Sequence, residues 1–142
     1  MHRSYLNEHK SFSLDHNERL EFLGDAVLEL IVTEYLYTNY PNPEGDLTNW
    51  RSSLVNFKML SARAEELDLY PLMYMSRGEA RDQSPKARMY ILANAYEAVI
   101  GALFVDQGLE ATKQFILKEL IAHFEEILEK KLYLDSKSKF QE

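Results

Sequence analysis

Helical periodicity runs through almost the whole chain of 142 residues and constrains its fold more than any other feature. Apolar residues recur three and four positions apart, as they do on one face of an α-helix. Alternation of apolar and polar residues, which a half-buried strand requires, never persists beyond a few positions. The sequence therefore predicts an all-α domain, and its clearest helix covers residues 17–39.

The first part of this helix carries two kinds of side chain on different sides. Four carboxylates fall within an arc of roughly 80°: Glu18, Glu21, Asp25 and Glu29. Five apolar residues fall within roughly 100° on the far side: Leu20, Leu23, Val27, Leu30 and Ile31. Because like charges at this spacing repel, the acidic stripe predicts a bound metal ion or a basic partner. The alternative is an ordinary solvated face.

Phe22 lies beside the acidic stripe and away from the apolar one. An aromatic ring in that position is exposed to water unless something covers it. The cover could be a loop of the same chain or a second subunit. We favour a subunit interface, because an exposed aromatic side chain is a common anchor of association.

The composition fits one compact domain. No apolar run approaches the roughly 20 residues of a membrane span, and no signal sequence begins the chain, so we expect a cytoplasmic protein without membrane contact. The absence of cysteine excludes disulfides, a thiol nucleophile and a cysteine-ligated zinc site. The net charge of −7 has the wrong sign for a free-standing nucleic-acid binder, so metal ions or another domain would have to assist.

Breaks in the periodicity divide the rest of the chain into further helices. Asp15 is a plausible N-cap for the clearest helix, and two prolines with a glycine interrupt the chain at 40–45. Asp46 or Thr48 can start the next helix. Gln107 and Gly108 should stop the helix that begins at Pro85. The expected helices are 3–10, 17–39, 46–69, 85–106 and 109–131, followed by a polar tail.

A second group of polar residues lies in an apolar, alanine-rich run at 93–103. Asn94 and Glu97 are three residues apart, so their oxygens project from one face of a helix. Ala98 and Gly101 are small enough to let another helix approach. Burial of a glutamate in such a run is unfavourable unless the carboxylate is paired or metal-bound, which makes Glu97 a candidate functional residue.

Basic residues gather in and beside a loop-like stretch at 75–84, just before the expected helix at 85–106. They are Arg77, Arg81, Lys86 and Arg88. They are our candidates for contacts with phosphate groups. Glu79 and Asp82 are interleaved with them, so the alternative is a set of scattered solvent-exposed charges.

Four segments, in order, resemble motifs of the endonuclease domain of bacterial ribonuclease III. They are HRSYLNE at 2–8, NERLEFLGD at 17–25, EGDL with RSSLV at 44–55, and ILANAYEAVIGALFVDQG at 91–108. Together they span most of the chain. Four motifs in the family's order are far more specific than any one of them.

The resemblance implies a helical homodimer in which the Phe22 ring fills a pocket of the partner. It also implies Mg²⁺-dependent cleavage of double-stranded RNA to 5′-phosphate and 3′-hydroxyl ends, with Mn²⁺ as a substitute. By motif position, four residues match the metal ligands: Glu21, Asp25, Asn94 and Glu97. Two more match acidic positions near the scissile phosphate: Glu18 and Glu44. Such oxygen ligands suit Mg²⁺, which activates water and stabilises a leaving oxygen.

The chain departs from the family pattern in two ways. The family commonly has aspartate where this chain has Asn94, so one negative charge is missing and metal affinity should be lower. We expect 1–132 to form the endonuclease domain and 133–142 to be a linker to a double-stranded-RNA-binding domain that the chain lacks. RNA affinity would then be weak and salt-sensitive.

Two other functions compete with the nuclease. A catalytically silent member of the fold would be a dimeric scaffold or an RNA-bound structural protein, and Asn94 gives this alternative its support. A di-iron carboxylate protein would need Glu-x-x-His pairs, and the four histidines supply none. The retained carboxylates favour the metal-dependent endoribonuclease.

Overall fold

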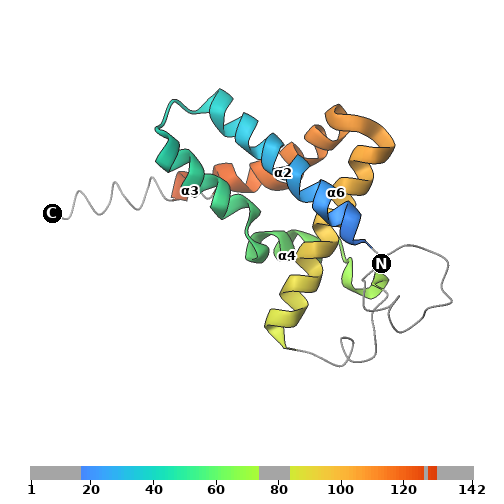
Figure 1. The fold of residues 1–142 in the computed structure, drawn as a ribbon. Coiled ribbons are helices and arrows are strands. Elements are labelled where there is room, and N and C mark those ends of the chain that lie inside the picture. The colour runs from blue at the N-terminus through green and yellow to red at the C-terminus, as the bar shows by residue number, and fades with distance from the viewer. Residues whose placement is uncertain (1–16, 74–83, 127, 131–142) are drawn as a thin grey trace.

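The computed structural model describes residues 17–73, 84–126 and 128–130. These residues are almost entirely helical and contain no strand, so the all-α prediction is confirmed for them (Figure 1). The elements are α2 (Glu18–Asn39), α3 (Glu44–Val55), α4 (Phe57–Glu66), a 3₁₀ turn η1 (Tyr70–Leu72), α6 (Pro85–Ile116) and a π-helical turn η2 (Leu117–Ile121). The helix predicted at 3–10 and the tail at 133–142 lie outside the described residues. Asp15, the predicted N-cap of α2, lies outside them too, and the N-cap position of α2 is occupied by Asn17 instead.

The core forms where α2 and α4 pack against α6. Its largest fully buried side chain is Tyr96 of α6, and Leu92 and Ile100 lie one turn to either side. Figure 1 shows the first part of α2 crossing the middle of α6, where Leu20 and Gly24 approach Glu97 and Gly101. The functional residues predicted on α2 and α6 therefore lie close to one another.

The buried side of α2 differs from the predicted one, because Leu30 is 57% exposed. The buried residues of α2 are Gly24, Val27, Leu28, Ile31, Val32 and Leu36. On a helical wheel, Val32 and Leu36 point in the same direction as Glu21 and Asp25. The side that packs on α6 is thus rotated toward the acidic stripe, and the two carboxylates lie at the rim of the helix–helix contact.

The single helix predicted from 46 to 69 is wrong, because the chain breaks at Asn56. Its backbone is extended (φ −73°, ψ 161°), and its Oδ1 accepts a hydrogen bond of 2.8 Å from the Met59 N–H, which caps the start of α4. The first of the two helices also begins earlier than predicted, at Glu44, since Pro43 occupies the N-cap position. The turn at Asn56 redirects α4 onto α6.

Arg63 of α4 is buried, which is unusual for a charged side chain. Its Nη2 lies 3.2 Å from the Glu66 carboxylate, but Nε and Nη1 have no hydrogen-bond partner among the described residues. The Tyr96 hydroxyl is likewise buried without a partner there. Each such group destabilises a folded protein, so this side of the core is less favourable than a purely apolar one.

The predicted stop at Gly108 appears as a sharp bend within α6. Gly108 has φ 87°, a left-handed backbone that favours glycine, and helical geometry resumes directly after it. Beyond the bend the chain returns toward α2 (Figure 1). Lys113 pairs with Glu34 at 3.0 Å, and the Tyr35 hydroxyl donates a 2.8 Å hydrogen bond to Glu125. These contacts hold the C-terminal helical segment against α2.

One helix, Pro85–Lys130, is long and apolar enough to cross a membrane by length and composition. This differs from the prediction that no segment would reach that length. Half of its most apolar window is buried inside the protein, as in the core helix of a globular domain. The bend at Gly108 also divides it.

Candidate functional site

Two glycines allow α2 and α6 to touch at their crossing. A Cβ atom on Gly24 would overlap the backbone carbonyl of Glu97, and one on Gly101 would overlap the backbone carbonyl of Leu20. Any larger residue at either position would push the helices apart. This close approach brings Asp25, the neighbour of Gly24, next to the side chain of Glu97.

Glu97 is 8% exposed, so its carboxyl group is largely removed from water. Burial, the hydrogen bond with Asp25 and the negative charges of Asp25 and Glu21 raise the pKa of Glu97 to about 8 from 4.5. At neutral pH the carboxyl group of Glu97 therefore holds a proton when no cation is present. The predicted burial of Glu97 in this apolar run is confirmed, and its role as a functional residue stays a prediction.

A divalent cation fits the chemistry of these groups. Two carboxyl groups are in contact, and a third, that of Glu21, is close enough for its charge to act on Glu97. Oxygen ligands of this kind suit a hard cation, which would take the place of the shared proton. Among the described residues, however, no three His, Cys, Asp or Glu side chains already converge as a cluster that could hold an ion. Side-chain rotation would have to complete the site.

The other predicted site residues of this region lie around the Asp25–Glu97 pair. Glu21 and Asn94 are half-buried, while Glu18 and Asp25 are exposed. Asn94 lies one turn before Glu97 on α6. The structure therefore places Glu21, Asp25, Asn94 and Glu97 on the two helices that cross at the glycines. That they form a metal-binding quartet stays a prediction.

Glu44 does not belong to the same cluster. It lines a groove of its own at the other end of α2, together with Tyr37, Thr48 and Arg51. Asp25 and Tyr37 are twelve residues apart on α2, which corresponds to about 18 Å. Within one chain, Glu44 is therefore far from the Asp25–Glu97 pair.

Phe22 is 81% exposed and stands at the edge of a surface hollow. The hollow is also lined by Leu20, Leu23 and Val105, of which Val105 is itself exposed. No described loop covers the ring. The predicted exposure of Phe22 is confirmed, and its role at an interface stays a prediction.

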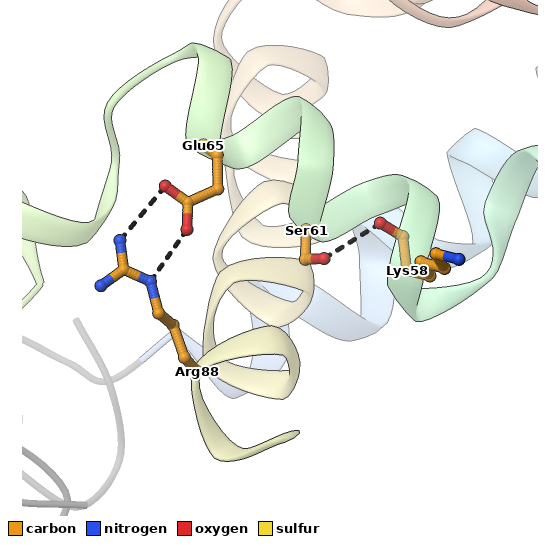
Figure 2. A network of polar contacts seen from close by, with 4 residues as sticks. All are labelled: Lys58, Ser61, Glu65 and Arg88. Carbon is orange, nitrogen blue, oxygen red and sulfur yellow. Dashed lines mark hydrogen bonds and ion pairs between the residues drawn. The ribbon is translucent and has the colours of Figure 1, made fainter. Parts of the chain in front are cut away.

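Arg88, one of the four predicted phosphate contacts, is already engaged within the chain. Its Nε and Nη2 donate to the two Glu65 oxygens at 2.8 and 3.2 Å (Figure 2). Its guanidinium also stacks on the Tyr70 ring, 4.1 Å from the ring centre. Arg88 therefore ties the start of α6 to α4 and η1. Lys86 lies 6.0 Å from the centre of the Tyr90 ring, and Arg77 and Arg81 lie outside the described residues.

Sequence reasoning identified Gly101 as a small neighbour of the site but missed the contribution of Gly24. Two signals could have found it. Gly24 lies within a helix, where glycine is unfavourable, and directly beside an acidic residue. A glycine inside a helix often marks a place where another backbone comes close, and at Gly24 that backbone is the Glu97 segment of α6.

Comparison with known proteins decides the family. The ribonuclease-III-like family matches residues 1–124. The chain belongs to the ribonuclease-III-like family. Ribonuclease 3 of Streptococcus sanguinis strain SK36 is 46% identical over 125 residues, which cover 87% of this chain and 53% of that protein. This ribonuclease-III-like chain spans a little over half the length of the curated relatives it matches.

Solved structures agree with this assignment. The nuclease domain of ribonuclease III from Campylobacter jejuni matches with a TM-score of 0.71 and 42% identity, over 82% of this chain and 80% of that chain. A second structure of the same domain matches with a TM-score of 0.69 and 44% identity, over 78% of each chain. It describes structural flexibility in the region involved in dimer formation of that protein. The resemblance of the four motifs to ribonuclease III is thus confirmed.

Proposed function

We propose that this chain is the catalytic part of a divalent-metal-dependent endoribonuclease that cleaves double-stranded RNA. The observation that carries the proposal is the buried Glu97 carboxyl in contact with Asp25, at a crossing made possible by two glycines. Burial of such a carboxyl pair destabilises the metal-free protein, and a bound cation would offset that cost by pairing with the negative charge. The relatives named ribonuclease 3 supply the reaction class.

The residues divide the work by position. Asp25 and Glu97, with Glu21 and Asn94 after side-chain rotation, would hold Mg²⁺, and Mn²⁺ would substitute for it. The ion would supply Lewis-acid activation of water and charge stabilisation at the leaving 3′ oxygen, which leaves 5′-phosphate and 3′-hydroxyl ends. Burial of Glu97 limits its contact with water and strengthens its attraction to a cation. Glu18, exposed one turn before Glu21, would face the RNA.

The protein would act as a homodimer in the cytoplasm, in RNA processing. The exposed Phe22 ring and the adjacent hollow supply a projection and a recess of the kind a self-complementary interface needs. Dimer formation of the related nuclease domain from Campylobacter jejuni supports this proposal. Glu44 would serve as an additional acidic position near the RNA rather than as a ligand of the same ion.

The test is incubation of the chain with a long RNA duplex at low salt, with Mg²⁺, with Mn²⁺ or with chelator. We expect metal-dependent cleavage to short duplexes with 5′-phosphates. Glu97→Gln should abolish cleavage and keep the dimer, whereas Glu126→Gln, an exposed glutamate away from the crossing, should leave the rate unchanged. Cleavage that survives in chelator or in Glu97→Gln would contradict the proposal.

The second candidate function is a catalytically silent dimeric scaffold or RNA-bound structural protein. Asn94 favours it, together with the absence of three converging acidic or histidine ligands among the described residues. Thermal melting during titration with Ca²⁺ or Mg²⁺ separates the two functions. A nuclease site gives metal-linked stabilisation that Glu97→Gln removes, whereas a silent scaffold gives none.

A further inference from the structure

The face of α6 that carries the candidate site continues to the start of that helix. Lys86, Tyr90, Asn94 and Glu97 fall within an arc of roughly 80°. Tyr90 precedes Glu97 by about 10 Å along the helix axis and Lys86 by about 16 Å. Tyr90 is 39% exposed, and Lys86 is exposed. Nucleotides that flank a phosphodiester at Glu97 could therefore lie along this face.

An aromatic pair lies on this part of the surface. The rings of Phe57, the first residue of α4, and Tyr90 meet edge to face with their centres 4.8 Å apart. Phe57 is 42% exposed, so neither ring is enclosed by the core. The Lys86 ammonium lies 6.0 Å from the centre of the Tyr90 ring. Lys58, which follows Phe57 in sequence, lines a separate hollow with Asn56 and Met59.

Lys86 differs from the neighbouring arginines in its partners. Arg63 and Arg88 are paired with carboxylates of α4, whereas Lys86 forms no ion pair with any described residue. A cation beside an exposed ring, with no described carboxylate paired to it, is notable in a chain with a net charge of −7. Its charge is complementary to phosphate, and the rings offer apolar edges for a sugar.

We propose that Phe57, Lys86 and Tyr90 form a ledge that binds the ribose–phosphate backbone of one RNA strand beside the cleaved bond. The proposal rests on the proposed function and names the residues that hold its substrate. Lys86 contacts a phosphate. The Tyr90 ring packs on a ribose, and its hydroxyl hydrogen-bonds the 2′-hydroxyl that distinguishes RNA from DNA.

The experiment measures binding of a labelled RNA duplex by fluorescence anisotropy over a series of salt concentrations, with Ca²⁺ in place of Mg²⁺ to prevent cleavage. Lys86→Gln should weaken binding and reduce the slope of log Kd against log salt by about 1. Tyr90→Leu should weaken binding about five- to tenfold with an unchanged slope, since it removes no charge. Tyr90→Phe should keep the ring contact and lose part of the preference for RNA over a DNA duplex.

Lys118→Gln is the matched control, because Lys118 is an exposed lysine on the π-helical turn outside the ledge. It should leave affinity and slope unchanged. Thermal melting of each variant separates a folding defect from a binding defect, and the salt slope of Lys86→Gln decides the matter if Tyr90→Leu folds poorly. If the wild-type chain binds the duplex and neither Lys86→Gln nor Tyr90→Leu changes the affinity, the ledge is overturned while the proposed function stands. A wild-type chain that neither binds nor cleaves the duplex would overturn the proposed function as well.

Discussion

Replacement of Glu97 by glutamine should stabilise the metal-free protein above neutral pH, although it removes a proposed metal ligand. Glu97 is nearly buried, touches Asp25 and experiences the charge of Glu21. Its ionised form is therefore unfavourable in the folded chain. Glutamine has the same shape, carries no charge and can donate a hydrogen bond to the Asp25 carboxylate.

The pKa of Glu97 sets the size and the pH range of the effect. Below pH 4.5 the carboxyl group is protonated in both the folded and the unfolded chain, so it contributes no pH dependence. Between 4.5 and about 8 the unfolded chain has released a proton that the folded chain retains, so the free energy of unfolding falls as pH rises. The fall ends above about pH 8 and amounts to roughly 4–5 kcal/mol. Because an ionised carboxylate can turn toward water, we expect Glu97→Gln to recover about 2–4 kcal/mol at pH 9.

The assay is urea unfolding in chelator between pH 4 and 9, followed by circular dichroism and Trp50 fluorescence at fixed protein concentration. The difference in unfolding free energy between Glu97→Gln and wild type should be near zero at pH 4 and grow toward pH 9. Glu126→Gln should show no such trend. Added Mg²⁺ should stabilise wild type and not Glu97→Gln, by about 2.7 kcal/mol at one hundred times the dissociation constant. A difference that does not change with pH would refute the reasoning.

Four further substitutions test other parts of the structure. Asn94→Asp restores a negative charge and should lower the Mg²⁺ concentration needed for half-maximal cleavage; an unchanged requirement means that Asn94 is not a ligand. Gly101→Ala places a methyl group against the backbone of α2. Thermal melting should show that the free energy of unfolding falls by about 1–3 kcal/mol, and the cleavage assay should show that activity is lost. Phe22→Glu should shift the dimer toward monomer in analytical ultracentrifugation, and an intact dimer would remove Phe22 from the interface. Arg63→Met replaces a buried guanidinium with two unpartnered nitrogens, so unfolding should show a gain of about 1–2 kcal/mol; a loss instead would reveal a partner for that group.

The sequence by itself determined the helical fold and indicated the residues of the candidate site. Periodicity located α2 and the start of α6 at Pro85, because these depend on the spacing of apolar residues and on proline, both of which are local. The chemistry of single residues was also enough to predict that Glu97 is buried and that Phe22 is exposed. A glutamate in an apolar run and an aromatic outside the apolar stripe are unusual wherever the helices lie.

The break at Asn56 shows where local reasoning begins to fail. An asparagine is unfavourable inside a helix and favoured at an N-cap, but helices with favourable packing still accept one in their interior, so the residue alone does not decide between the two. Here α4 must turn onto α6, so Asn56 adopts an extended backbone and caps the new helix. Sequence periodicity continued through this position and gave no sign of the turn.

Only the tertiary structure decided which side of α2 is buried and which residues meet. The contact of Gly24 with the backbone of Glu97 rotates the packed side of α2 toward its acidic stripe, which leaves Leu30 exposed and brings Asp25 to Glu97. Arg88, predicted to bind phosphate, is instead held by a carboxylate of α4. These outcomes depend on how helices distant in sequence cross and approach, and a periodic pattern within one helix carries no information about the position of another.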